Sequence, residues 1–161
     1  EASLVIVSHN PAGWPALAQR AEALGVARAL HFLGQVSEQE KIALLRACDV
    51  YVLPSRYEGF GLPLLEAMAC RAPIVASDVP VIHEIVRDGE NGLLVPHRNP
   101  ESLGAALLRL LGDPELRARL VAGGERALRE RYDGGQLIRQ VLAAYEEAIA
   151  LAGKGSGSHH G

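Results

Sequence analysis

Short apolar runs alternate with amphipathic stretches from the N-terminus of the chain to Pro96. Between the runs, apolar residues recur at helical spacing, as in Trp14, Leu17 and Leu24. Strands that alternate with helices predict βαβ units, and therefore a three-layer α/β fold with a parallel sheet covered on both faces. The five runs that predict buried strands lie at residues 4–8, 29–34, 49–55, 73–77 and 92–96.

The helices are predicted mainly from their ends. Ser37, with Glu40 three residues later, is a capping-box signature that begins a helix. Asp113 and Pro114 suit the N-cap and the first position of another helix. Further helices are expected at about 63–70, 79–86, from 100 onwards and at about 136–151.

Composition restricts the classes of function. The 161 residues suit one domain, which we place at 1–152, and the Gly/Ser-rich residues 153–161 are typical of a linker with a purification-tag remnant. A net charge of −3, scattered basic residues and 4% aromatics argue against nucleic-acid binding. No apolar run reaches the ~20 residues that span a bilayer, and no signal peptide is recognisable.

The numbers and spacing of cysteines and histidines restrict the classes of function further. Two unclustered cysteines, Cys48 and Cys70, indicate reduced thiols and hence a cytoplasmic protein. The six histidines show no ligand spacing, so no metal is expected. Neither a G-x-S-x-G elbow nor a G-x-G-x-x-G after the first strand is present.

The stretch RYEGFGLPLLEAMACRAPIVASD, residues 56–78, carries the candidate chemistry. It follows the third predicted strand, and ligands of such sheets bind at the carboxyl ends of strands. Gly59 and Gly61 allow a close backbone approach or a positive φ, and Pro63 suits the first turn of the next helix. Free amides at a helix start favour an anion, for which a phosphate is the natural candidate.

Two carboxylates flank this turn. Glu66, about one turn into the helix, can accept hydrogen bonds from a diol such as ribose, and Glu58 can bind hydroxyls of a polyol. A nucleotide diphosphate sugar offers hydroxyls, phosphates and hydroxyls in that order. Two glutamates eight positions apart are nevertheless common, so an ordinary loop beside an exposed helical glutamate is the alternative interpretation.

A wider resemblance favours the first interpretation. The sequence resembles the C-terminal, donor-binding domain of retaining glycosyltransferases with the GT-B fold, notably family 4, over nearly all of residues 3–150. The quoted stretch, extended to SRYEGFGLPLLEAMACRAPIVASDVP, is similar to the E-x7-E region of that family. The other matching motifs are LVIVS, HFLGQVS, CDVYVLPS, DGENGLLVP, NPESLGAALLRLLGDPELRARL and the final helix.

The resemblance implies a role for each matching residue. Glu58 corresponds to the acid that contacts the donor sugar, the catalytic position, and Glu66 to the acid that binds the ribose. The resemblance implies that main-chain amides of the glycine loop contact the diphosphate; these residues are Gly59, Phe60, Gly61 and Leu62. It also implies that the loop after the second strand contacts the nucleobase; these residues are Gly34, Gln35 and Val36. The substrate implied is a nucleotide diphosphate sugar, with no cofactor and no bound metal.

The sequence also departs from the family. The family has one more strand and helix before the first strand found here, and they carry the Arg and Lys that neutralise the diphosphate. It also has an N-terminal acceptor domain. Neither has a counterpart in this sequence, so we expect little transferase activity from this chain alone. Arg71 stands where glycine is usual, Lys41 where an apolar residue is common, and Ser8 replaces a glycine. These departures suggest an engineered or excised fragment.

The missing strand leaves two arrangements of the sheet open. Five strands could close into one flavodoxin-like sheet of order 2-1-3-4-5, which is our prediction. The alternative is an open seam filled by another chain, for example in a homodimer.

Two other functions are compatible with parts of the sequence. The chain could be a fold fragment or scaffold that binds nothing and self-associates. It could also be a flavodoxin-like receiver or flavin module, but Ser8, His9 and Asn10 stand where such modules carry an acidic cluster.

Overall fold

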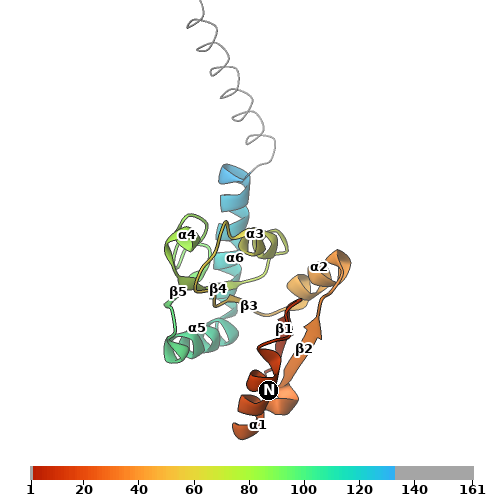
Figure 1. Cartoon of the computed structure of the whole chain (residues 1–161). Coiled ribbons are helices and arrows are strands. Elements are labelled where there is room, and N and C mark those ends of the chain that lie inside the picture. The colour runs from red at the N-terminus through yellow and green to blue at the C-terminus, as the bar shows by residue number, and fades with distance from the viewer. Residues whose placement is uncertain (1, 133–161) are drawn as a thin grey trace, which may run out of the picture. The chain divides into compact units, whose positions relative to one another are not determined.

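The computed structural model describes residues 2–132, which alternate strands and helices as predicted (Figure 1). The chain divides into two compact units, Glu1–Ala47 and Cys48–Gly161. The predicted helix at 136–151 and the predicted linker at 153–161 lie outside the described residues. The assignment of 1–152 to one domain stays a prediction.

The first unit is a two-stranded parallel sheet with two helices. Its strands pair in register from Leu4 with Leu30 to Ile6 with Phe32, after which an irregularity places Val7 opposite Gly34. Trp14 stacks on Phe32, with ring centroids 4.9 Å apart. The elements are β1 (Leu4–Val7), α1 (Trp14–Ala23), the 3-10 turn η1 (Ala27–Ala29), β2 (Leu30–Gly34) and α2 (Glu38–Ala47).

The strand β1 is less buried than its composition predicts. Leu4, Val5 and Val7 are 50%, 43% and 43% exposed. Among the strands of residues 2–132, β1 pairs with β2 alone, whereas a central strand of a doubly wound sheet has neighbours on both edges. The pairing of β1 beside β3, and with it the order 2-1-3-4-5 in one sheet, is therefore not confirmed. The described strands form two sheets, of order β1-β2 and β3-β4-β5.

The sheet of the second unit is covered on both faces at its central strand, β4, as the sequence predicts. Its central strand is buried from Ile74 to Ser77, so side chains on both faces are covered. All pairings in this sheet are parallel. The elements are β3 (Tyr51–Leu53), α3 (Leu62–Ala69), β4 (Ile74–Asp78), α4 (Pro80–His83), β5 (Leu93–Pro96), α5 (Pro100–Gly112) and α6 (Pro114–Arg131).

The core of the second unit joins the sheet to the last two helices. Seven buried side chains form one cluster: Val75, Leu93, Val95, Ala106, Leu110, Leu116 and Leu120. The predicted cap of α6 is confirmed, because the Asp113 carboxylate accepts a hydrogen bond from the Leu116 amide at 2.8 Å. Asn99 caps α5 in the same way, with the Ser102 amide as donor at 2.9 Å.

Arg71 occupies the left-handed position where glycine is usual in the family. Its φ is 65°. The Arg71 amide donates to the Met68 carbonyl and the Ala72 amide to the Ala67 carbonyl, which together form a Schellman motif after α3. The Arg71 guanidinium lies 3.3 Å from the Glu125 carboxylate on α6. A left-handed arginine costs about 1 kcal/mol, which this fold tolerates.

A glycine in α6 lets the helix touch the turn before β5. A β-carbon built on Gly123 would lie 1.9 Å from the Glu90 carbonyl oxygen, so the backbones of helix and turn are in direct contact. A β-carbon built on Gly104, in α5, would lie in open space. Two glycines inside helices therefore have opposite packing requirements.

We predict that Gly123→Ala destabilises the protein by more than about 2 kcal/mol, because backbone must move to admit a methyl group. Gly104→Ala, the matched control, is expected to stabilise it by about 0.5–1 kcal/mol through helix propensity. Urea unfolding followed by circular dichroism measures both. Equal effects of the two substitutions would contradict the close contact.

Candidate functional site

The candidate turn, residues 54–61, leaves the carboxyl end of β3. Leu53 pairs with Ala76 of β4, so the turn begins at the edge of the sheet where β4 also ends. Tyr57 is 86% exposed and Phe60 59% exposed, which places the turn at the protein surface. This is the edge at which ligands of parallel α/β sheets bind.

Gly61 takes the positive φ that the sequence analysis expected. Its φ is 78°, and the residue is the N-cap of α3. A β-carbon at this position would lie 2.6 Å from Cδ1 of Ile85, so any other residue there is both strained and crowded. Gly59 has open space and no positive φ, so the positive φ is confirmed for Gly61 alone of the two, and a close approach of Gly59 to a ligand stays a prediction.

The start of α3 carries no side-chain cap. Gly61 has no side chain to accept the first-turn amides, and the Leu64 amide turns back to the Gly61 carbonyl at 2.9 Å. Pro63 lies in the first turn, as predicted, although the helix begins one residue earlier, at Leu62. An uncapped N-terminus with the positive end of its dipole favours an anion.

The two predicted carboxylates lie on either side of this N-terminus in the sequence and are both half-buried. Cγ of Glu58 lies 3.8 Å from the position that a Gly61 β-carbon would take, so this side chain lies beside the helix start. Glu66 is on α3, and the Leu62 side chain at the helix start is 58% exposed. The second unit therefore holds Glu58, Gly59, Phe60, Gly61, Leu62 and Glu66 within one turn and its helix.

The other predicted residues lie in the first unit, at the end of β2. Gly34 has a φ of 67°, and its carbonyl accepts the Ser8 amide at 3.0 Å, so the loop after β1 adjoins it. Gln35 and Val36 follow directly. Because Gly34, Gln35 and Val36 belong to a different unit from Glu58, their combination into one site stays a prediction.

The predicted capping box fixes the segment that follows Val36. The Ser37 amide donates to the Glu40 carboxylate at 2.8 Å, and the Glu40 amide donates to the Ser37 hydroxyl at 3.3 Å. The bond from the Ser37 amide, and then that from its hydroxyl, lowers the pKa of Glu40 below its ordinary value of 4.5. Lys41, noted above as unusual, pairs with Glu38 at 2.8 Å.

Sequence reasoning missed one polar pair at the same edge of the sheet. His83, in the last turn of α4, bonds through Nε2 to the Asp78 carboxylate at the end of β4. The two residues lie five positions apart across a strand-to-helix turn, where helical spacing gives no signal. Both side chains are about half exposed, at 54% and 50%.

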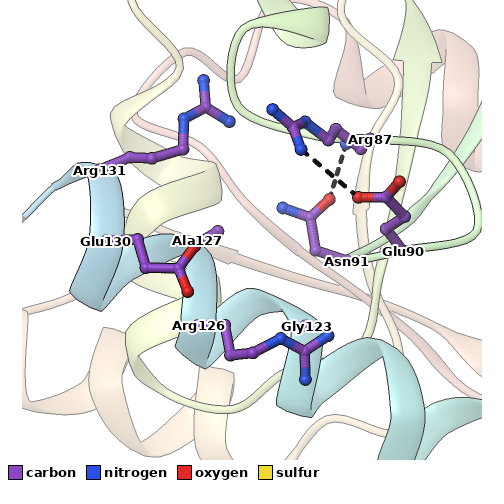
Figure 2. A pocket seen from close by; sticks show the side chains of 8 residues that line it. All are labelled: Arg87, Glu90, Asn91, Gly123, Arg126, Ala127, Glu130 and Arg131. Atoms are coloured by element: carbon purple, nitrogen blue, oxygen red, sulfur yellow. Dashed lines mark hydrogen bonds and ion pairs between the residues drawn. The ribbon is translucent and has the colours of Figure 1, made fainter.

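A hollow in the second unit is lined by eight residues (Figure 2). It lies between the turn before β5 and α6, and none of its lining residues belongs to the predicted site. Its volume of about 80 Å³ is far below the several hundred Å³ typical of a site for a ligand of nucleotide size. The lining residues are Arg87, Glu90, Asn91, Gly123, Arg126, Ala127, Glu130 and Arg131.

Two features bear on metals and membranes. Within residues 2–132, the side chains of His, Cys, Asp and Glu form no cluster of three or more that could hold a metal ion. None of the helices in the same part of the chain has the length and apolar character that crossing a bilayer requires.

The fold and this glycine turn define a parallel α/β domain of the kind found in glycosyltransferases. The sequence matches the family model for glycosyl transferases group 1 over residues 2–127. The chain belongs to that family.

Relatives with known names support the assignment. The chain is 42% identical over 135 residues to a phosphatidyl-myo-inositol mannosyltransferase of Mycobacterium leprae, a match that covers 83% of this chain and 36% of the relative. It is 41% identical to a D-inositol 3-phosphate glycosyltransferase of Acidothermus cellulolyticus, covering 79% of this chain and 28% of that protein. The chain thus spans about a third of the length of these relatives.

Solved structures agree with the fold. A sucrose-phosphate synthase from Thermosynechococcus elongatus superposes with a TM-score of 0.75 and 31% identity, covering 88% of this chain and 39% of that one. The C-terminal domain of a glycosyl transferase group 1 protein from Francisella tularensis gives 0.67 and 32%, covering 74% and 62%. These matches confirm the predicted resemblance to the C-terminal domain of GT-B glycosyltransferases.

Replacing Ser37 tests the capping box. We predict that Ser37→Ala raises the pKa of Glu40 part of the way toward 4.5, because the hydroxyl's bond to the carboxylate is lost while the larger effect, the bond from the residue 37 amide, remains. Since the folded-state pKa is depressed, Glu40 stabilises the fold above pH 4.5, and this contribution is lost as the pH falls through the depressed value. NMR titration of the side-chain carboxyl measures the pKa. An unchanged value in Ser37→Ala would contradict the contribution of the serine hydroxyl.

Alanine at the two loop glycines tests the geometry of the turn. Gly61→Ala is expected to destabilise the protein by about 1–3 kcal/mol, because it combines a positive φ with a contact to Ile85. Gly59→Ala, with open space, should stay within about 0.5 kcal/mol of the parent. Chemical unfolding of both variants decides the matter, and equal costs would show that the turn differs from the one described.

Proposed function

We propose that this chain binds the nucleotide diphosphate sugar donor of a retaining glycosyltransferase. One observation carries the proposal: an uncapped helix N-terminus at Gly61, at the carboxyl edge of the sheet, with Glu58 beside it. Membership of the glycosyl transferases group 1 family supports the same chemistry. The diphosphate would be held by main-chain amides of residues 59–62.

The two acids are proposed to bind the carbohydrate parts on either side of the diphosphate. Glu58 would contact the donor hexose, and Glu66 the ribose. The relatives named mannosyltransferases make a hexose the favoured sugar. Gly34, Gln35 and Val36 are proposed to contact the nucleobase through main-chain groups.

Donor cleavage leaves negative charge on the departing diphosphate, which takes the bonding electron pair from the anomeric carbon. Amides at the start of α3 and the helix dipole would stabilise that charge without a metal ion or other cofactor. We propose that the chain by itself binds donor but transfers little sugar, since it spans only about a third of the length of the relatives. Cysteine usage favours a cytoplasmic location.

An alternative function keeps support from one observation. The apolar side chains of Leu4, Val5 and Val7 in β1 are substantially exposed. A chain with this surface could self-associate through β1 and bind no donor. Light scattering over a range of concentrations measures whether the chain is a monomer. A monomer that binds donor would contradict this alternative.

Calorimetric titration of UDP, GDP and their hexose conjugates tests the proposal. We expect saturable binding of one nucleotide series, weakened about 10- to 100-fold by Glu66→Gln through loss of a charged acceptor. Glu58→Gln should weaken the sugar conjugate and leave the bare diphosphate unchanged. Glu22→Gln, an exposed glutamate on α1, is the control. Absence of binding at millimolar ligand, or equal affinity in Glu66→Gln, would overturn the assignment.

A further inference from the structure

We propose that Ile85 is a positioning residue for the glycine turn and that the end of α6 holds it in place. The inference rests on the proposed function in naming a diphosphate as the ligand of that turn. Within the second unit, Tyr132 contacts Glu84, the neighbour of Ile85 in the sequence, and Ile85 contacts Gly61.

The first link is the contact between Ile85 and Gly61. Ile85 is 3% exposed, and its Cδ1 fills the space that a side chain at Gly61 would need. The isoleucine therefore rests directly on the backbone of the helix start. We expect a displacement of Ile85 to change the direction of the amides of the turn, which are the groups proposed to bind phosphate.

The second link fixes the backbone of Ile85 from one side. Asn91 is 5% exposed, and its Nδ2 donates to the Ile85 carbonyl at 2.9 Å. The Arg87 amide donates to Oδ1 of Asn91 at 2.7 Å. A buried amide with both ends bonded holds the segment 85–87 in one conformation, since losing either bond leaves a buried polar group unpaired.

The third link fixes the same segment from α6. The Tyr132 hydroxyl donates to the Glu84 carbonyl at 2.9 Å, and the Arg131 guanidinium donates to the same oxygen. Figure 2 shows Arg87 and Asn91 on the turn before β5 and Arg131 on α6, around the hollow described above. The Arg131 guanidinium also lies 5.4 Å from the centre of the Tyr132 ring.

Asn91 and the end of α6 have no role in the proposed donor site, and these contacts connect both of them to the glycine turn. The end of α6 bonds to Glu84, the buried Asn91 bonds to Ile85, and Ile85 contacts Gly61. The bond between Glu84 and Tyr132 joins residues 48 positions apart in the sequence. We infer that Tyr132, Asn91 and Ile85 tune the affinity for the diphosphate without touching it.

Two conservative variants test this inference in the full chain. Ile85→Val removes only Cδ1, and Tyr132→Phe removes only the hydroxyl donor. Both should weaken GDP or UDP binding, about three- to tenfold for Ile85→Val and about two- to fivefold for Tyr132→Phe, because misplaced binding groups lose affinity steeply. The matched controls are Ile82→Val, equally buried in α4, and Arg126→Gln on α6.

The measurement that tests the link from α6 to the turn needs no ligand. In two-dimensional NMR spectra of the free chain, Tyr132→Phe should shift the amide resonances of Gly61 and leave those of Gly104 in place. Ile82→Val should lower the melting temperature about as much as Ile85→Val without weakening diphosphate binding. A Gly61 resonance unmoved in Tyr132→Phe would overturn the inference, as would equal diphosphate affinity in Ile85→Val and Ile82→Val.

The two proposals fail separately. If neither GDP nor UDP binds the parent chain, the proposed function fails, and the Gly61 resonance still decides whether α6 positions the turn. If a diphosphate binds but Tyr132→Phe leaves both affinity and Gly61 unchanged, the function stands and the positioning role is wrong.

Discussion

The close approach of Ile85 to the backbone of Gly61 is the constraint on which the rest of the account depends. It favours glycine at the N-cap of α3, where the residue takes a φ of 78°. Serine, aspartate or asparagine could cap the helix and satisfy its first amides, but each would take a strained positive φ and would have to displace Cδ1 of Ile85. The same packing that favours glycine therefore leaves the helix start without a side-chain cap, as an anion site needs.

Packing elsewhere in the second unit supports this arrangement. The strand β4 is buried from Ile74 to Ser77, and α6 touches the turn before β5 at Gly123 with no side chain between them. That contact brings α6 within bonding distance of the segment that carries Ile85. Close-packed interiors transmit displacements, so the glycine turn is placed by elements far from it in the sequence.

Local sequence signals predicted the order of the elements in residues 2–132, although β3 and α4 are shorter than predicted. The Ser37–Glu40 capping box and the Asp113 cap follow from rules that act over a few residues, and the positive φ of Gly61 is one of the two uses expected of that glycine. The contacts of Ile85 with Gly61 and of Tyr132 with Glu84 join distant segments, so no periodicity announces them. The exposure of β1 was mispredicted because apolar composition indicates a buried strand without saying whether a second neighbour is present.

A crystal structure of the chain grown with the nucleoside diphosphate hexose that it binds most tightly tests the central claim most directly. The account predicts phosphate oxygens at about 3 Å from main-chain nitrogens of residues 60–62, with the Glu58 carboxylate on the hexose and the Glu66 carboxylate on the ribose. A ligand bound elsewhere, with the glycine turn unoccupied, would contradict it.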